Sequence, residues 1–384
     1  MSRCVLLSFL FLIILKRESM LDPEELAALM RKKVAKNSRY LLAKIAGSGQ
    51  APGERKILNE FFRYKDYLDP AENEDWFAAS LEEVWSPKFL GLRENFRELP
   101  LERVKKLEFQ NPPYSAAYRL KGKQGDPREY TKVFTLQIAA CNYDCNYCYV
   151  PRVLKTCYPE FSRYFTAREI VENFLRCRES MPLNVLRISG GEPLAIVPEM
   201  VIDIYAELES RSLCEEVYLW VDTNLSTSRF MERVEGDLKS VLSKRNVGVV
   251  GCFKGVNERD FSLLTGAREE FYDCQFETAK LLLSWKCDFY CYLPALVYGD
   301  RIEEKLREFI ERQRELNRHL PLRTEVIVIL PYPAMKVNAE RCAKSGRSLP
   351  KTDQRDVLDA WYNRLLPEFY DARMLSLYCC EVEL

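Results

Sequence analysis

Histidine is almost absent from this sequence. The 384 residues contain one, His319, which lies in a charged stretch with helical spacing. Catalysis by a histidine base is therefore not expected. Net charge is absent as well, because 57 Lys and Arg residues balance 57 Asp and Glu residues. No overall basic field favours nucleic acid, so we expect no DNA partner.

A long apolar run is also missing. Residues 5–15 are apolar except for Ser8, with Arg3 before them and Lys16-Arg17 after them. A membrane-spanning helix needs about 20 apolar residues. The run resembles the apolar part of a signal peptide, but no small-x-small cleavage site follows it. We interpret residues 1–19 as a mis-assigned start or a weak anchor, and we expect no other membrane contact.

Cysteine, in contrast, is abundant, with fourteen residues. In a short secreted protein such a number would indicate disulfides. This chain is long and 47% hydrophobic, so it has enough residues to build a core without them. A reducing, cytoplasmic location fits better, with most cysteines acting as small buried apolar side chains.

Three cysteines form a local pattern. Cys141, Cys145 and Cys148 have C-x3-C-x2-C spacing and directly follow the largely apolar run 133–140. Three thiolates on a short loop can hold three irons of a [4Fe–4S] cluster, which leaves the fourth iron free to bind a small molecule. A zinc site and three unrelated core thiols are the alternatives. A closed zinc site has four ligands, and the loop offers neither a histidine nor a fourth cysteine.

The N-terminal third predicts a mostly helical accessory region at residues 20–129. Apolar residues recur at helical spacing from Asp22 to about Ile45, with Pro23 at the first helical position. Shorter helices are predicted at 54–62 and 73–85. A mixed stretch follows, with a possible hairpin at 121–127.

Residues 130–335 alternate short apolar runs with amphipathic stretches. Strands are predicted at 132–140, 184–189, 216–222, 247–254, 287–297 and 324–330. Helices are predicted at 167–180, 198–210, 229–244, 270–285 and 301–318. Strands that alternate with helices predict consecutive right-handed βαβ units and a parallel sheet, whose strand C-termini carry the chemistry. Residues 336–384 form a C-terminal extension without a motif.

Two predicted strands end in polar turns. The second ends in Ser189-Gly190-Gly191-Glu192-Pro193, where glycines allow a close backbone approach and Glu192 offers a negative acceptor. The third ends in Asp222-Thr223-Asn224. Each could be an ordinary turn. Their position after the cysteine loop favours a shared site.

Together, the cysteine spacing, the aromatic residue before the third cysteine and the GGEP turn resemble the radical S-adenosylmethionine (SAM) superfamily. The resemblance implies an α/β fold, an open partial (β/α)6 barrel. It also implies a [4Fe–4S] cluster and SAM, with Glu192 contacting the SAM amino group. The implied cluster ligands are Cys141, Cys145 and Cys148, and the implied SAM-binding residues in these motifs are Tyr147, Gly190, Gly191 and Glu192.

Within that superfamily, the segments at 222–224 and 249–255 resemble the pyruvate formate-lyase activating enzyme and its relatives. The resemblance implies further SAM contacts by Asp222, Asn224 and Lys254. Two positions depart from that branch. Cys252 replaces the aspartate of its Asp-x-Lys pattern, and Phe261 replaces a histidine. These departures put the branch's cation site and substrate in doubt.

We therefore expect a radical SAM enzyme that reductively cleaves SAM to a 5′-deoxyadenosyl radical and abstracts a hydrogen atom from an unknown substrate. The resemblance implies a ferredoxin- or flavodoxin-like electron donor, and a glycyl-radical enzyme or another macromolecule as a possible substrate. The alternatives are an iron–sulfur electron carrier without SAM chemistry and a peptide- or RNA-modifying radical SAM enzyme. No catalytic side chain is identified. Cys342, Cys379 and Cys380 lack the spacing of an auxiliary cluster.

Overall fold

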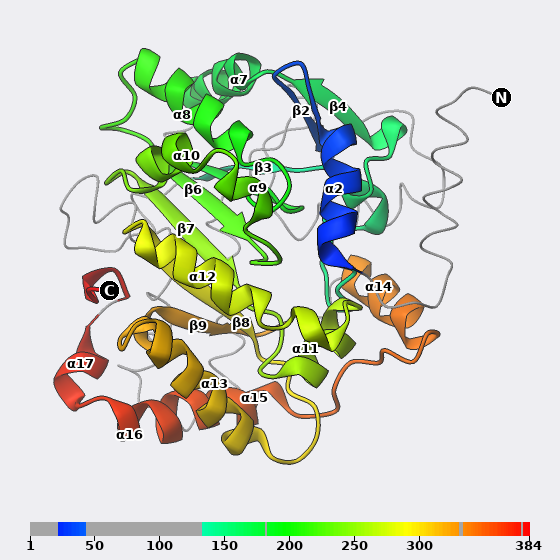
Figure 1. Cartoon of the computed structure of the whole chain (residues 1–384), viewed down its shortest axis with the longest axis vertical. Coiled ribbons are helices and arrows are strands. Elements are labelled where there is room, and N and C mark those ends of the chain that lie inside the picture. Colours follow the sequence, from blue (N-terminus) through cyan, green and yellow to red (C-terminus); the bar gives the residue numbers. More distant parts are fainter. Residues whose placement is uncertain (1–21, 44–132, 181–182, 330–332, 378) are drawn as a thin grey trace.

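The computed structural model describes residues 22–43, 133–180, 183–329, 333–377 and 379–384 (Figure 1). Its centre is a six-stranded sheet with the strand order β3-β5-β6-β7-β8-β9, in which every neighbouring pair is parallel. The strands are β3 (Val133–Gln137), β5 (Val185–Ser189), β6 (Tyr218–Thr223), β7 (Val247–Cys252), β8 (Asp288–Pro294) and β9 (Thr324–Ile327). Spatial order follows chain order, as successive right-handed crossovers require. The predicted open α/β sheet is confirmed.

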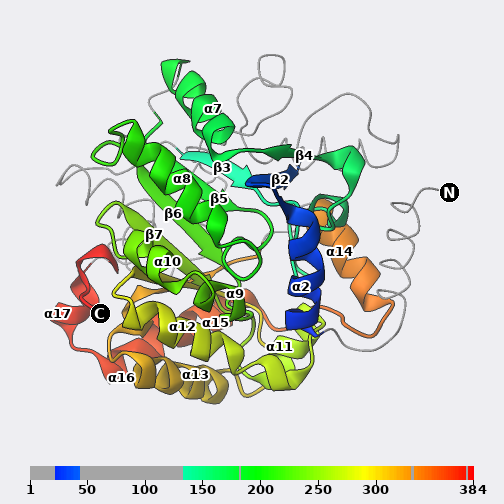
Figure 2. The ribbon, with the colours of Figure 1, turned by 45° about the horizontal axis from the view of Figure 1, so that its top comes forward.

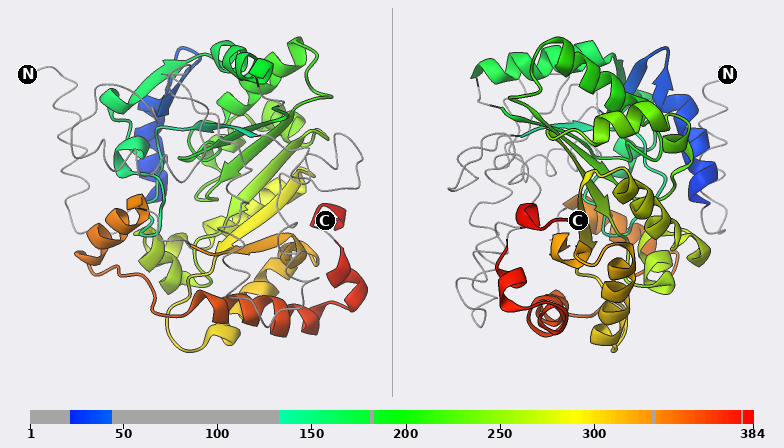
Figure 3. Two further views of the ribbon diagram at one scale, coloured as in Figure 1. Left: turned by 180° about the vertical axis from the view of Figure 1, so that it is seen from behind. Right: turned by 60° about the vertical axis from the view of Figure 1, so that its left-hand side comes forward.

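Helices cover one face of this sheet, which we call the outer face (Figure 3). They are α7 (Ala167–Ser180), α8 (Glu199–Ser210), α9 (Arg229–Glu232), α10 (Glu235–Leu242), α11 (Glu258–Thr265), α12 (Cys274–Ser284) and α13 (Ile302–Leu316). Side chains alternate between the two faces of a strand. Leu136, Ile188, Val221 and Val249 therefore point to the outer face, where they join the main apolar core. This burial fixes the register of the whole sheet.

The opposite, inner face of the sheet carries a smaller and more polar set of residues. Val133, Val185, Trp220, Val250 and Tyr290 form its apolar cluster. Charged and polar side chains share this face because they alternate with outer-face residues along the same strands. They are Arg187, Asp222, Tyr292 and Glu325.

The predicted helices differ from the observed ones mainly at two breaks. The helix predicted at 229–244 is divided at Arg233 and Val234 into α9 and α10, because Val234 leaves the helical backbone conformation at φ −124° and ψ 26°. The helix predicted at 270–285 begins as a 3-10 turn, Glu269–Phe271, before α12. Helix α11 was not predicted, although Asn257 caps it by accepting a hydrogen bond from Asp260 N at 2.8 Å.

The helix predicted from Asp22 to about Ile45 is wrong beyond Val34. Helix α2 (Pro23–Val34) begins where expected, with Asp22 accepting hydrogen bonds from Glu24 N and Glu25 N. The chain then forms β1 (Ala35–Lys36) and β2 (Arg39–Ala43). Between them, Asn37 and Ser38 take positive φ values of 51° and 54°, which make a tight hairpin turn. Tertiary pairing therefore overrides the helical spacing of the apolar residues.

Strand β2 pairs antiparallel with β4 (Ser162–Phe165), a strand that was not predicted. The three strands form a small second sheet of order β1-β2-β4. Its buried residues Tyr40, Leu41 and Leu42 pack into the main core. The accessory region is thus partly β-structure, and the helices and hairpin predicted between residues 54 and 127 lie outside the described residues.

The C-terminal extension crosses the molecule from the cysteine side of the sheet to β9 (Figures 1 and 2). Helix α14 (Pro333–Ala343) lies near α2 in both views, at the far end from the other C-terminal helices. The chain continues through α15 (Gln354–Asp359), the π-helix Ala360–Leu365, α16 (Leu366–Phe369) and α17 (Ala372–Ser376) to a last turn at Cys379–Glu381. The extension therefore contacts both ends of the sheet.

Among the described residues, no helix combines the length and the apolar character needed to cross a bilayer. Residues 1–19, interpreted from the sequence as a mis-assigned start or a weak anchor, lie outside the described part.

Candidate active site

The cysteine loop begins four residues after β3, at the carboxyl edge of the sheet. Cys145 is buried, and Cys141 and Cys148 are half-buried. None of the three is in a disulfide. Within the described ranges, no three His, Cys, Asp or Glu side chains are arranged to hold a single metal ion. A cluster does not need such a group, because each cysteine binds a different iron.

Helix α11 and the turn after it hold the middle of the loop. Asp144 N donates to Thr265 O at 3.0 Å, and Asn146 N donates to Leu264 O at 2.9 Å. The Asn146 side chain also donates to Leu263 O at 3.2 Å. Paired backbone groups of this kind fix the path of a loop that has no regular structure of its own.

The N-terminal helix holds the start of the loop. Asn142 follows the first cysteine, is fully buried, and donates to Pro23 O at 3.0 Å and to Ser226 Oγ at 2.7 Å. Arg31 of α2 in turn donates to Ile196 O at 2.7 Å, in the segment after the GGEP turn. Helix α2 therefore connects the cysteine loop with two other loops at the same edge of the sheet.

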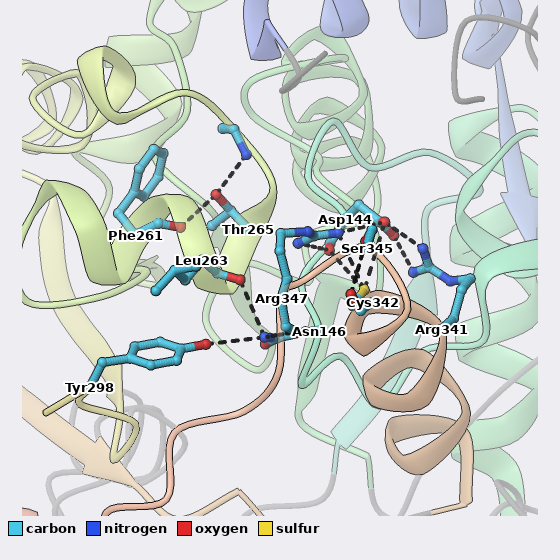
Figure 4. A network of polar contacts seen from close by, with 11 residues as sticks. Asp144, Asn146, Phe261, Leu263, Thr265, Tyr298, Arg341, Cys342, Ser345 and Arg347 are labelled. Carbon is cyan, nitrogen blue, oxygen red and sulfur yellow. Dashed lines mark hydrogen bonds and ion pairs between the residues drawn. The ribbon is translucent and has the colours of Figure 1, made fainter. Parts of the chain in front are cut away.

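The C-terminal extension holds the loop from a third side (Figure 4). Arg341 makes a two-pronged ion pair with Asp144, with N–O distances of 2.7 and 2.6 Å. Arg347 reaches the same carboxylate at 3.1 Å and the Asp144 backbone oxygen at 3.1 Å. Asn338 donates to Cys148 O at 2.8 Å and to Val150 O at 3.1 Å. We call Asn338, Arg341 and Arg347 the C-terminal brace.

Charge explains how strongly the brace holds Asp144. Burial alone would raise the pKa of this carboxyl group, but Lys155, Arg341 and Arg347 lower it to about 2. Asp144 is therefore ionised at neutral pH and strongly attracted to both arginines. Ion pairs with two parallel hydrogen bonds are among the stronger polar contacts in proteins.

The two glycines of the GGEP turn are required by packing. A Cβ atom on Gly191 would lie 2.0 Å from Ala140 O, and one on Gly190 would lie 2.2 Å from Gln137 Cγ. Gly190 also has a φ of +87°, which disfavours any side chain. Glu192 N donates to Ala140 O at 2.7 Å. The turn is thus pressed against the residues that lead into Cys141.

The Glu192 carboxylate joins two turns at this edge. It is completely buried and accepts hydrogen bonds from Thr223 Oγ1 at 2.8 Å, from Ala195 N at 2.9 Å and from Asn224 N. Burial raises its pKa to about 7, although these hydrogen bonds and Lys254 oppose the shift. The structure thus brings together Glu192 and the Asp-Thr-Asn segment. Its carboxylate already has protein donors, so its contact with a SAM amino group stays a prediction.

Asp222 and Asn224 point to different partners. Arg187 donates to Asp222 Oδ2 from Nε at 3.0 Å and from Nη2 at 2.6 Å, and Ser189 Oγ donates to the same oxygen. Asp222 Oδ1 is buried without a partner. Asn224 instead donates to Asn142 Oδ1 at 2.9 Å and approaches Cys141 Sγ at 3.9 Å. Asn224 is therefore the member of the motif that reaches the cysteine loop.

Tyr147 and Lys254 lie together beside the cysteines. The Lys254 ammonium is 5.8 Å from the centre of the Tyr147 ring, and the Tyr147 hydroxyl is buried without a partner. Burial would lower the pKa of Lys254, but Tyr147, Cys252 and Cys145 outweigh that effect and raise it. Lys254 therefore stays charged near the ligand thiols. Its role toward SAM stays a prediction.

The residues present fit an iron–sulfur cluster. Burial raises the pKa of Cys141 to about 12 and that of Cys145 to about 11, so neutral thiols are stable there until a metal replaces their protons. Lys155 is 2% exposed beside these thiols, and its Nζ has no hydrogen-bond partner in the part of the chain that the structure describes. A buried, unpaired ammonium is costly unless a negative group accompanies it. A thiolate-bound cluster supplies that negative charge.

The remaining cysteines do not assemble into a second site within the described part of the chain. Cys342 lies against the cysteine loop, with its Sγ 3.9 Å from Asp144 O. Cys379 belongs to the inner-face apolar cluster. Cys287 and Cys291 are buried in the main core, 6% and 1% exposed, in line with the expectation that most cysteines are small buried apolar side chains.

Sequence reasoning missed the residues that hold the loop in place. Asp144 and Asn146 lie inside the recognised motif, yet their partners Arg341 and Arg347 are about two hundred residues away. Lys155 was missed as well, because a single lysine after a loop has no distinguishing pattern. The capping signal of Asn257 could have revealed α11, which supplies the loop's backbone acceptors.

Comparison with known proteins agrees with this geometry. Residues 137–284 match the sequence profile of the Radical SAM superfamily. The match begins at the end of β3 and includes the cysteine loop, the GGEP turn, the Asp-Thr-Asn segment and Lys254. No curated protein matches the chain.

Solved structures show weaker likenesses. SuiB of Streptococcus suis bound to S-adenosylmethionine is 18% identical, with a TM-score of 0.34, over 46% of this chain and 36% of that chain. Histidine-tagged anSMEcpe with bound AdoMet is 14% identical, with a TM-score of 0.38, over 60% of this chain and 57% of that chain. The cobalamin-dependent S-adenosylmethionine radical enzyme OxsB is 11% identical, with a TM-score of 0.34, over 60% and 33%. The chain thus spans between a third and somewhat over half of these proteins.

The assignment rests on the profile match and on the residues at the edge of the sheet. The three-cysteine loop, the glycine turn packed against it and the Asn224 contact to Cys141 all fall inside the matched range. Members of this superfamily are enzymes that use a [4Fe–4S] cluster and S-adenosylmethionine. Residues 137–284 of this chain are therefore a radical SAM superfamily domain.

Proposed function

We propose that this protein is a radical SAM enzyme that binds a [4Fe–4S] cluster through Cys141, Cys145 and Cys148. The observation that carries the proposal is the convergence of the three-cysteine loop, the GGEP turn and Asn224 at one sheet edge. When bound and reduced, the cluster supplies the electron that cleaves SAM to methionine and a 5′-deoxyadenosyl radical. The protein then has to position SAM and substrate and exclude water.

Several residues are placed to do this. Glu192 fixes the Thr223-Asn224 turn through its own hydrogen bonds, and Asn224 then orients Asn142 beside the first cysteine. Buried Tyr147 and half-buried Lys254 shield the loop from water on the side of β7. We propose that SAM contacts come from this group of residues. They are Tyr147, Gly190, Gly191, Glu192, Asp222, Asn224 and Lys254.

The inner face of the sheet is the proposed position of the substrate. Cys252, Tyr292 and Glu325 lie side by side there on β7, β8 and β9, because strand register places each beside the next. The activating-enzyme branch is a weaker proposal. Phe261, which replaces that branch's histidine, is fully buried and packs edge-on against Tyr143 with ring centres 5.6 Å apart. This position therefore serves packing in the present chain.

The proposed partner is a one-electron donor of the ferredoxin or flavodoxin class, because the reaction consumes an electron that the protein does not hold. A macromolecular substrate, including a glycyl-radical enzyme, a peptide or an RNA, is compatible with the site but is supported only by resemblance. We propose a cytoplasmic location because Cys141, Cys145 and Cys148, like most other cysteines of the described residues, are free thiols.

Anaerobic reconstitution tests the cluster. The wild-type protein should bind about four irons and four sulfides per chain. Replacing Cys141, Cys145 and Cys148 together by alanine should abolish the cluster's visible absorbance, whereas replacing the buried core pair Cys287 and Cys291 should not. A triple variant that still holds a full cluster would show that other residues are the ligands.

SAM cleavage separates an enzyme from an electron carrier. The reduced, reconstituted protein should form 5′-deoxyadenosine from SAM slowly, even without substrate, as measured by chromatography. The triple cysteine variant is the matched control and should form none. A wild-type protein that has an intact, reduced cluster but neither binds nor cleaves SAM would instead be an electron carrier.

A further inference from the structure

Lys155 occupies an unusual position at the cysteine loop. It is the last residue of the 3-10 turn Arg152–Lys155, and its backbone oxygen accepts a hydrogen bond from Cys141 N at 3.0 Å. The residue is 2% exposed, and among the described residues its ammonium has no hydrogen-bond partner. The groups that act on it electrostatically are three cysteines and one carboxylate, namely Cys148, Asp144, Cys141 and Cys145.

Asp144 is the obvious counter-ion for this ammonium, but it already has other partners. Arg341 contacts both carboxylate oxygens, at 2.7 and 2.6 Å, and Arg347 contacts one of them at 3.1 Å. The carboxylate therefore faces two guanidinium groups, and among the described residues no ion pair joins it to Lys155. The C-terminal brace thus takes up the hydrogen-bonding capacity of Asp144, and the other groups that act on the Lys155 charge are the three thiols.

A [4Fe–4S] cluster on three thiolates supplies the missing negative charge. Its oxidised core carries two positive charges and its ligands three negative ones, which leaves one negative charge in total. One-electron reduction makes the total two negative charges. A nearby fixed positive charge therefore stabilises the reduced form more than the oxidised form, and more strongly when it is shielded from water.

We propose that Lys155 is the counter-ion of the cluster and raises its reduction potential. The inference rests on the proposed function, since it requires a cluster on the three cysteines. The step concerned is the transfer of one electron from an external reductant to the oxidised cluster. No bond forms or breaks in that step. Lys155 keeps its proton and acts only through its charge, so it is a positioning and tuning residue.

The experiment is a redox titration of the reconstituted full-length protein with dithionite and mediators, followed by electron paramagnetic resonance of the reduced cluster. In Lys155→Met the ratio of reduced to oxidised cluster at a fixed potential should fall at least about tenfold, which is a shift of about 59 mV for one electron. Lys155→Arg keeps the charge and should stay near the wild-type potential. The matched control is Lys336→Met, which removes an exposed lysine of α14 and should change nothing.

The results of the titration distinguish a failure of the inference about Lys155 from a failure of the proposed function. A Lys155→Met protein that holds a full cluster at an unchanged potential would overturn the inference and leave the proposed function intact. A wild-type protein that takes up no cluster would instead overturn the proposed function. If Lys155→Met cannot retain the cluster but Lys155→Arg can, the positive charge is required to hold the cluster, which supports the counter-ion role, and the shift in potential is then measured in Lys155→Gln. If both folded variants lose the cluster, as judged by iron content and circular dichroism, the shape of the lysine is what matters and the inference is wrong.

Discussion

Two carboxyl groups of this protein have opposite surroundings: Asp144 is half-buried in the cysteine loop after β3, and Glu325 is buried on β9 at the other edge of the sheet. Asp144 in the cysteine loop has two arginine partners, and its pKa is lowered to about 2. Glu325 on β9 is 8% exposed, and no described residue donates to its Oε2, so burial raises its pKa to about 8. The first group is therefore a carboxylate at neutral pH, and the second mostly a neutral acid.

The cysteine loop and the inner face near β9 thus differ in how well their buried polar groups are paired. At the cysteine loop, the polar groups of α2, α11 and the C-terminal brace hold one another, which suits a cofactor of fixed shape. On the inner face, Glu325 of β9 has no ion-pair partner among the described residues, and its Oε2 accepts no hydrogen bond from them. Native proteins keep few such groups, and they occur preferentially at functional sites. We therefore infer that the loop region holds the cofactor, and that the inner face near β9 contacts the substrate proposed above.

The largest effect should come from removing the paired carboxylate. Asp144→Ala leaves Arg341 and Arg347 half-buried and unpaired, and also releases the contact that fixes the middle of the loop. Breaking a buried ion pair costs about 3–5 kcal/mol, and partial exposure of Arg341 reduces this to about 2–4 kcal/mol here. Urea unfolding of the apo protein should show the loss, and the reconstituted variant should hold less iron.

The control for that variant is Glu304→Ala, which breaks the exposed i,i+3 pair of Glu304 with Arg301 on α13. Exposed pairs contribute little, so the control should unfold with the wild type. If Asp144→Ala and the wild type were equally stable, the ion pairs of the C-terminal brace would contribute nothing to the free energy of unfolding. Asp144 and Glu325 would then differ in their contacts but not in their effect on stability.

Replacing the unpaired carboxyl group of Glu325 should stabilise the protein, which is the opposite of the effect expected at Asp144. The ordinary pKa of glutamate is 4.5, and that of Glu325 in the folded protein is about 8. Between these values the unfolded chain is ionised and the folded protein is not, so wild-type stability falls as the pH rises from 4.5 to 8. Glu325→Gln removes this loss. The variant should match the wild type near pH 4.5 and exceed it by a few kcal/mol above pH 8.

Denaturant unfolding of both proteins at pH 5 and pH 8.5 measures this effect. Glu304→Gln, which changes an exposed glutamate, is the control and should follow the wild type at both pH values. A constant difference between Glu325→Gln and the wild type across this range would mean that Glu325 is ionised in the folded protein. The contrast with Asp144 would then disappear.

Much of the fold could be predicted because its signals are local. The six apolar runs between residues 132 and 330 all contain strands of the sheet, since each is short and an amphipathic helix separates it from the next. The cysteine loop and the glycine turn were recognisable for the same reason. The prediction that failed was the helix beyond Val34, where Leu41 and Leu42 pair with β4 more than a hundred residues away. Local spacing contains no information about such a partner.

The chemistry of the site was less predictable than its location. Glu192 and Asp222 were identified from their motifs, but their hydrogen bonds to Asn224, Thr223 and Arg187 depend on which strands become neighbours. Arg341 and Arg347 carried no signal at all, because isolated arginines in a C-terminal stretch usually face solvent. Their role follows only from the placement of α14 beside the cysteine loop.

The smallest effects should come from a pair of glycines that test how tightly the cofactor side is packed. In Gly191→Ala the new Cβ would lie 2.0 Å from Ala140 O, a backbone atom that cannot move without displacing Cys141. Forced overpacking of this kind typically costs about 1–3 kcal/mol. Gly236→Ala places its Cβ where nothing lies within 4 Å, in exposed helix α10. Since alanine favours helix more than glycine does, that variant should be more stable by up to about 1 kcal/mol.

Thermal unfolding of the two apo variants should therefore shift in opposite directions, and only Gly191→Ala should also bind less iron on reconstitution. If Gly191→Ala unfolds and binds iron as the wild type does, the turn is not pressed against the cysteine loop, and the cofactor side is no more tightly built than the region of β9.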